Sequence, residues 1–157
     1  MSASESLKRM CIVLPTPPKP VAAYVPFVRH DGLVFTSGQI PLENGVVRYT
    51  GKVGRERSLE EAQAAARLCA INALAVGAEA AGGIDAITRV LKVTLFVASA
   101  EGFTDQHKVA NGASEFLVEV FGGLGRHARA AVGVAELPMN ATTEIDVVFA
   151  IQATAAR

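Results

Sequence analysis

The sequence predicts an α+β domain in which two helices cover one face of a sheet. Hydrophobic residues recur at helical spacing over residues 59–81 and 104–121, and a pair of glycines follows each segment. Residues 87–98 instead alternate between apolar and polar side chains, as in a strand with one buried face. Shorter strand-like segments surround these three, so the expected order is β-β-β-α-β-α-β-β.

Turn and capping signals support the remaining elements. The other predicted strands cover residues 24–29, 33–37, 46–49, 128–135 and 142–152. His30-Asp31-Gly32 is a tight turn between the first two, and Glu43-Asn44-Gly45 precedes the third. Ser58 and Glu61 have the spacing of a capping box, which predicts the start of the first helix.

The first 20 residues are expected to form an extended, proline-rich arm ahead of one domain that spans residues 21–157. Residues 15–20 read Pro-Thr-Pro-Pro-Lys-Pro, and proline lacks the N–H that helices and sheets require. The apolar run at residues 10–14 is too short for a signal-peptide core or a membrane span. A cytoplasmic protein is therefore expected.

Composition narrows the classes of partner. Fifteen basic residues balance fifteen acidic ones, which argues against a nucleic acid or an anionic membrane as the main partner. The two cysteines, Cys11 and Cys69, lie far apart and are expected to be reduced thiols. The three histidines lack metal-ligand spacing, and the chain has no glycine-rich phosphate loop, so neither a metal nor a nucleotide cofactor is expected.

Alternation along the last two strands suggests where charged side chains gather. In the last strand, Ile145, Val147 and Phe149 should face the helices, which places Glu144 on the opposite face. If the valines of residues 128–135 also face the helices, Arg129 joins Glu144 on the uncovered face. That face mixes charges with small apolar residues, so we expect another subunit to cover it and the interface to contain the site.

Arg129 is the leading candidate for chemistry. Its planar guanidinium matches a carboxylate through two parallel hydrogen bonds, so a small carboxylate metabolite is the expected ligand. A structural salt bridge with Glu144 or Asp146 is an equally good explanation from the residues alone.

Each of the other candidate site residues can be explained either by a function or by an ordinary structural role. Glu144 could activate a water molecule or be a solvated or salt-bridged strand residue. His127 shares the Arg129 face and is either a general base or a histidine at the rim. Gly38 would allow a ligand close to its backbone or simply permit a bend. Asn111, near the start of the second helix, could be a surface residue.

At these residues the sequence resembles the reactive-intermediate deaminase family, RidA/YjgF, also known as the L-PSP endoribonucleases. The likeness runs from about Pro20 to Ile151. Its specific part combines Ser37-Gly38-Gln39-Ile-Pro, Arg129, and Leu137-Pro138 followed by Glu144. The resemblance implies a chorismate-mutase-like fold and a homotrimer with clefts between subunits.

The resemblance also implies roles for individual residues. Arg129 would bind the substrate carboxylate, with help from backbone groups of Gly38 and Ala131, and Glu144 would position the hydrolytic water. The residues expected to line the cleft are Tyr24, Ser37 and Asn111. Family members hydrolyse enamines and imines such as 2-aminoacrylate to a 2-oxo acid and ammonia, and they require no cofactor.

The sequence departs from the best-known members of that family. Ala131 stands where a cysteine is common, and a glycine-rich stretch ending at His127 lengthens the approach to the Arg129 strand. These features resemble a divergent branch whose members are often named endoribonucleases. Two alternatives to a deaminase therefore stay open: a non-catalytic sensor of a small carboxylate, and an RNA-cleaving enzyme.

Overall fold

The computed structural model describes residues 1–19 and 21–153 and has a five-stranded main sheet with the strand order β1-β2-β7-β5-β6. These strands are β1 (Phe27–His30), β2 (Leu33–Thr36), β5 (Ile87–Ala98), β6 (Ala128–Val134) and β7 (Thr143–Ile151). The other elements are α1 (Ala3–Arg9), β3 (Leu42–Glu43), β4 (Val46–Val47), α2 (Leu59–Ala81), η1 (Ile84–Ala86), α3 (Gln106–Phe121), η2 (Gly122–Gly125) and η3 (Pro138–Asn140). From β1 onward the order has one strand more than the sequence predicted, because β3 pairs with β4 in a separate small hairpin; the other helices and strands follow the predicted order.

Two-residue turns close both hairpins, and both turns lie at predicted turn signals. Asp31 and Gly32 have φ angles of 48° and 76°, and Asn44 and Gly45 have 51° and 77°. Two successive positive φ angles match the right-handed twist of the flanking strands, and Asp-Gly and Asn-Gly adopt them at little cost.

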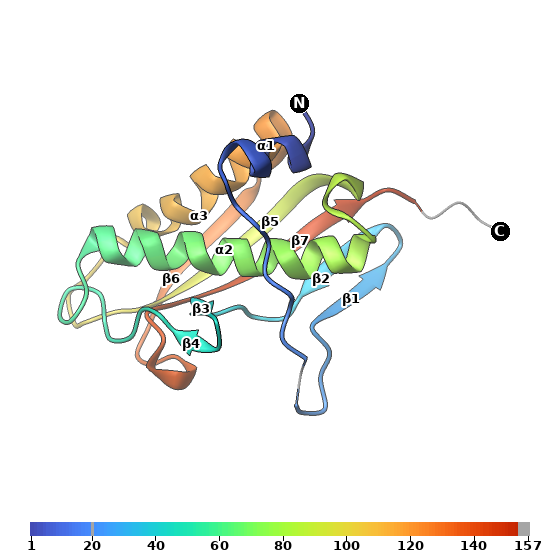
Figure 1. The fold of residues 1–157 in the computed structure, drawn as a ribbon. Coiled ribbons are helices and arrows are strands. Elements are labelled where there is room, and N and C mark those ends of the chain that lie inside the picture. The colour runs from blue at the N-terminus through green and yellow to red at the C-terminus, as the bar shows by residue number, and fades with distance from the viewer. Residues whose placement is uncertain (20, 154–157) are drawn as a thin grey trace.

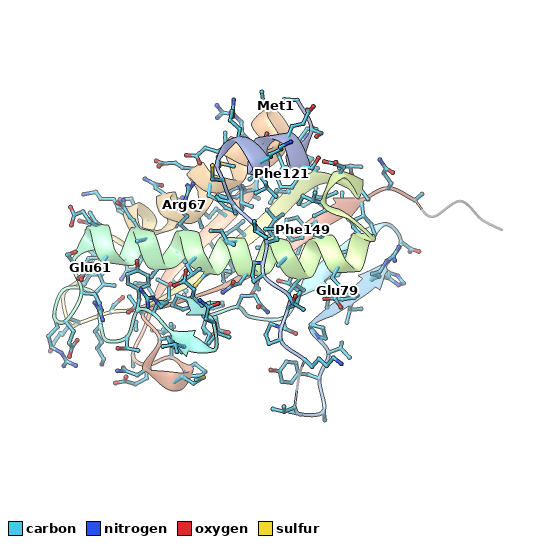
Figure 2. The ribbon with its side chains drawn as sticks, viewed as in Figure 1. Met1, Glu61, Arg67, Glu79, Phe121 and Phe149 are labelled. Atoms are coloured by element: carbon cyan, nitrogen blue, oxygen red, sulfur yellow. The ribbon has the colours of Figure 1, made fainter. Side chains whose placement is uncertain are left out.

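The long helix α2 forms the centre of the core. Its capping box is present: Ser58 Oγ accepts from Glu61 N at 3.2 Å, and the Glu61 carboxylate accepts from Ser58 N at 2.9 Å. Figure 1 shows α2 and α3 on the same side of the sheet, and Figure 2 places Phe149 of β7 behind α2. Gly77 allows this close approach, because a Cβ there would lie 2.6 Å from the Phe149 ring.

By length and composition, α2 could also cross a membrane. In the structure, however, 61% of its most apolar window is buried inside the protein. Burial against the sheet therefore accounts for its apolar character.

The predicted alternation of β7 is confirmed. The side chains that face the helices are buried, and they are Thr143, Ile145, Val147, Phe149 and Ile151. The intervening residues are partly exposed, and they are Glu144, Asp146, Val148 and Ala150. Glu144 therefore lies on the face that the helices leave uncovered.

The predicted facing of β6 is wrong. In the parallel pairing of β5 with β6, Arg129 lies beside Val93 and Ala131 beside Leu95. Val93 and Leu95 are fully buried on the helix side, so Arg129 and Ala131 also face that side, while Val132 is 43% exposed on the other. The sequence misled because the uncovered face is apolar too, and valines therefore do not distinguish the two faces.

The N-terminal arm is only partly extended, whereas the sequence analysis expected all of residues 1–20 to be extended. Ser2 and Glu5 form a capping box at the start of α1, and Leu7 belongs to the hydrophobic core. Ser4 fixes the helix further by donating through its N–H and hydroxyl to Asp85, at 2.9 and 2.6 Å. Residues 12–19 have neither helix nor strand and pass across α2 (Figure 1), and Pro20 and residues 154–157 lie outside the described residues.

Candidate functional site

The structure divides the predicted site residues between two places. The first, which we call the Arg129 site, lies where β6 meets α3 and contains Asn111, His127, Arg129 and Ala131. The second, the Glu144 groove, lies between the segment after β2, the N-terminal arm and α2, and contains Tyr24, Ser37, Gly38 and Glu144.

In the Arg129 site, α3 holds the guanidinium with neutral oxygens. Nη1 donates to Asn111 Oδ1 at 3.0 Å and to Ser114 Oγ at 3.1 Å, and Nη2 donates to the His107 carbonyl at 3.1 Å. Arginine has five N–H donors, so two stay available for a ligand within the described part of the chain. Because no carboxylate contacts Arg129 there, its charge is uncompensated and favours an anion.

The alternative of a structural salt bridge is therefore excluded for the described residues. Glu144 and Asp146 project from the uncovered face, whereas Arg129 faces α3. The Asp146 carboxylate is instead influenced by its neighbours on β5. Burial raises its pKa, while a hydrogen bond from Thr94 and the charge of Lys92 act in the opposite direction.

His127 is tied to the same cluster. Its Nδ1 lies 2.6 Å from the Gly125 carbonyl, which can only accept, so Nδ1 carries the proton. Partial burial lowers the pKa of His127. The hydrogen bond to Gly125 raises this pKa, and the positive charge of Arg129 lowers it, so the net shift is downward. The imidazole is therefore neutral at pH 7, and its Nε2 accepts from the Ser114 hydroxyl at 2.9 Å.

Ser114 and the His107 carbonyl were missed by the sequence reasoning. For Ser114 a signal existed: it follows Asn111 by three residues on a helix, so both side chains lie on one face, towards β6. A backbone carbonyl leaves no such signal in the sequence.

In the second place, the carboxylate of Glu144 lies directly against Gly38. A Cβ at residue 38 would overlap Glu144 Oε1 and would lie 2.9 Å from its Cδ. Burial raises the pKa of Glu144, and the nearby charge of Asp146 raises it further. The Glu144 carboxylate therefore occupies the space beside Gly38 that the sequence analysis had offered to a ligand.

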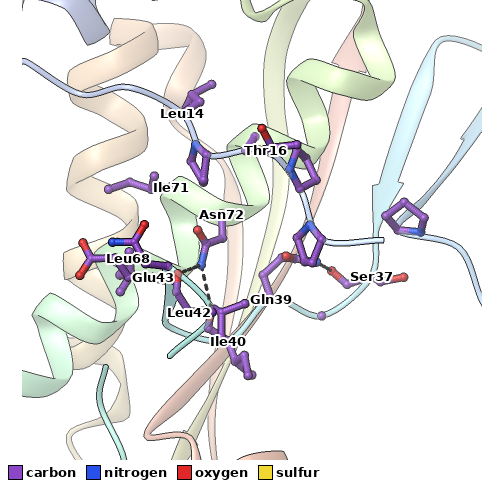
Figure 3. Close-up of a pocket in the computed structure, with 18 of the residues that line it drawn as sticks. Leu14, Thr16, Ser37, Gln39, Ile40, Leu42, Glu43, Leu68, Ile71 and Asn72 are labelled. Atoms are coloured by element: carbon purple, nitrogen blue, oxygen red, sulfur yellow. Dashed lines mark hydrogen bonds between the residues drawn. The ribbon is translucent and has the colours of Figure 1, made fainter. Parts of the chain in front are cut away.

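The groove beside Glu144 has a volume of about 970 Å³. Asn72 of α2 holds one wall by donating to the carbonyls of Ile40 at 3.0 Å and Leu42 at 2.9 Å (Figure 3). Ser37 does not point a free hydroxyl into the groove, because its Oγ donates to the Val25 carbonyl at 2.6 Å. Tyr24 lines the groove and is 59% exposed.

The two places cannot act on one small molecule within one chain. Across the sheet, Glu144 aligns with Phe96 and Phe96 with Val132, three residues along β6 from Arg129. The separation is about 10 Å along the strand and about 10 Å across two strand spacings, with the side chains on opposite faces. Among residues 1–19 and 21–153, no three His, Cys, Asp or Glu side chains gather to hold a metal ion.

Comparisons with known proteins agree on one family. The sequence model described as Endoribonuclease L-PSP matches residues 15–151. Protein TCP17 of Trypanosoma cruzi is 42% identical over 142 residues, which cover 90% of this chain and 89% of that protein.

Two solved structures are informative. The protein Atu1372 of Agrobacterium tumefaciens, described as having unknown function, is 46% identical, with a TM-score of 0.88 and coverage of 96% of this chain and 92% of that one. TdcF of E. coli with bound serine is 27% identical, with a TM-score of 0.63 and coverage of 88% and 94%.

Proposed function

Because the chain belongs to the Endoribonuclease L-PSP family, the RidA/YjgF family, we propose that it is an enamine/imine deaminase. Its substrates would be small imino acids of the 2-iminopropionate type, which it would convert to 2-oxo acids and ammonia in the cytoplasm as a homotrimer. The observation that carries the proposal is the uncompensated guanidinium of Arg129, held in place by three neutral oxygens. Such a group has the charge and the two spare donors that a substrate carboxylate needs.

The complete site would form between protomers. Arg129 has no acidic partner in the described chain, and Glu144 has no basic one, although burial raises the pKa of its carboxyl group. The Arg129 site of one protomer placed against the Glu144 groove of the next would bring the two together around one ligand. Closed rings of identical subunits produce such heterologous contacts.

The uncovered face of the sheet supports association. It exposes large apolar side chains on three strands: Val28 is 54% exposed on β1, Phe35 is 44% exposed on β2, and Val132 is 43% exposed on β6. Register aligns Val28, Phe35 and Val148 in one row. Contiguous apolar surface of this kind is usually covered by another protein chain.

The proposed reaction requires only two residue roles, binding of the carboxylate and proton transfer. Arg129 would hold the carboxylate so that C2 of the imine faces a water molecule beside Glu144. The water oxygen bonds to C2 while Glu144 accepts one water proton and passes it to the imine nitrogen, which gives a carbinolamine. Glu144 then takes the hydroxyl proton and transfers it to the amino nitrogen as the C–N bond breaks and the C2=O bond forms, releasing ammonia and the 2-oxo acid. A carboxyl group with a raised pKa suits both steps. TdcF, whose structure contains bound serine, supports a small ligand with a carboxylate.

Mixing subunits tests the proposal. Arg129→Ala should lose at least about a hundredfold in kcat/KM for freshly generated 2-iminopropionate, since two charge-assisted hydrogen bonds contribute roughly 3 kcal/mol. Arg129→Lys should also lose much of the kcat/KM, because a lysine ammonium cannot form two parallel hydrogen bonds with a carboxylate. When Arg129→Ala and Glu144→Gln chains are refolded together, random assembly should restore about a quarter of wild-type activity, because each shared site then has a one-in-four chance of both residues.

Other outcomes would redirect the assignment. Wild-type turnover by Arg129→Ala would remove the deaminase proposal. Binding of 2-oxobutyrate without imine hydrolysis would favour the metabolite sensor. Cleavage of RNA that co-purifies with the protein and is lost in both His127→Ala and Arg129→Ala would favour an endoribonuclease.

A further inference from the structure

The contacts of Arg129 continue into a chain of hydrogen bonds with a defined direction. The His127 Nδ1–H donates to the Gly125 carbonyl, which leaves Nε2 as an acceptor for the Ser114 hydroxyl. With its proton directed to His127, Ser114 Oγ presents a lone pair to Arg129 Nη1 at 3.1 Å. The chain starts at a backbone carbonyl of η2 and ends at the guanidinium.

We propose that Ser114 and His127 are positioning residues of the carboxylate site, which fix the guanidinium of Arg129 in its ligand-ready orientation. The inference rests on the proposed function and adds to it Ser114, which contacts Arg129, and His127, which links Ser114 to the Gly125 carbonyl. Neither needs to touch the substrate.

The geometry shows what the pair achieves. Asn111 and Ser114 take both Nη1 donors, and the His107 carbonyl takes one Nη2 donor. The donors that remain are Nε–H and one Nη2–H, which lie on two nitrogens of the same guanidinium and can together hold a carboxylate. The three anchors therefore orient the group and leave two donors for a ligand.

Without the anchors, this arginine would be mobile. It is an exposed residue on an edge strand, and a free arginine side chain carries about 2 kcal/mol of rotamer entropy that a bound ligand would have to offset. Holding the group with neutral oxygens reduces this cost without consuming its charge. A neutral His127 is essential here, because a protonated one could not accept from Ser114.

The experiment compares matched variants in two measurements: the Kd for 2-oxobutyrate by calorimetry, and KM and kcat for 2-iminopropionate. Ser114→Ala and His127→Leu should each raise Kd and KM by about fivefold, the typical net effect of one hydrogen bond, while kcat changes little. The double variant should be no worse than either single one, because both break the same chain.

Conservative variants separate positioning from a general loss of structure. His127→Gln should recover most of the affinity, since its amide oxygen can accept from Ser114, and Ser114→Thr should do the same because it keeps the hydroxyl. His30→Leu removes an exposed histidine that pairs with Asp31 in the β1–β2 turn, so it serves as the control and should match wild type.

The outcomes distinguish this inference from the proposed function. If Arg129→Ala loses binding and turnover while Ser114→Ala and His127→Leu match wild type, the positioning role is wrong and the deaminase stands. If Arg129→Ala itself retains both, the proposed function is wrong as well. Additive effects in the double variant, or covalent labelling of Ser114 by a fluorophosphonate with loss of kcat, would also overturn the positioning role.

Discussion

The Arg129 site and the Glu144 groove prepare a charged group in different ways. Three polar contacts orient Arg129, and its charge stays accessible to solvent. No side-chain hydrogen bond holds the Glu144 carboxylate within the described residues. It lies against Gly38, and partial burial raises its pKa. The contrast suggests that one place is built to bind and the other to exchange a proton.

Each place is incomplete in a complementary way. Among the described residues, the Arg129 site has a guanidinium and no acid, and the groove has an acid, a wall and volume but no guanidinium. Substitutions in β6 and α3 should therefore change ligand affinity. Turnover should also respond to substitutions at Gly38, at Glu144 and on the uncovered face of the sheet.

The largest expected effect comes from separating the two places. Val148→Lys would put an ammonium in the apolar row between Phe35 and Lys92, where burial of an unpaired charge costs several kcal/mol. Light scattering should show monomers, and imine hydrolysis should fall by about a hundredfold or more. Val46→Lys, on the exposed β3–β4 hairpin, should keep both assembly and turnover. An active monomeric Val148→Lys would place the whole site in one chain.

The next effect should be confined to the groove. Gly38→Ala would displace the Glu144 carboxylate. Because this carboxylate lies at the end of a flexible side chain, the free energy of unfolding should change little. We expect kcat to fall by roughly a hundredfold, as for loss of a general base, with the Kd for 2-oxobutyrate nearly unchanged. Gly123→Ala is the control, because a Cβ there meets nothing within 4 Å. Equal losses in kcat and affinity would contradict separate roles.

A smaller effect concerns stability and pH. Because the pKa of Glu144 is raised in the folded state, its ionised form is less favourable there than in the unfolded chain. Glu144→Gln should therefore be more stable than wild type above the raised pKa, by less than about 1 kcal/mol because the group is half-exposed. The difference should shrink as the pH falls through that pKa towards 4.5. Urea unfolding at several pH values measures it, and a difference that grows at acid pH would refute the burial argument.

The smallest effect uses the two thiols. Cys11 is exposed and lines the groove, whereas burial raises the pKa of Cys69 to about 12. Iodoacetamide should modify one thiol in the folded protein and two in denaturant, as counted by mass spectrometry. Modification at Cys11 should lower turnover by no more than about threefold while the affinity for 2-oxobutyrate stays the same. Rapid modification of Cys69 in the folded protein would indicate an opening of the core.

The sequence was most informative where a local rule acts alone. Asp31-Gly32 and Asn44-Gly45 require positive φ, and Ser58 with Glu61 starts a helix, so turns and helix ends could be located from the residues themselves. Strict alternation in β7 likewise put Glu144 on the correct face. The capping box of Ser2 and Glu5 carried the same kind of signal for α1, and the nearby prolines obscured it.

The tertiary structure decided what depends on pairing. Apart from Arg129, residues 128–134 are small or apolar on both faces, so only the parallel register with β5 determines that Arg129 faces α3. That facing separates Arg129 from Glu144 within the chain and links it to Ser114 and His127, an arrangement that no local pattern encodes. The sequence by itself thus determined which residue types are present for chemistry, while long-range strand pairing decided which of them meet, because partners distant in sequence select the face.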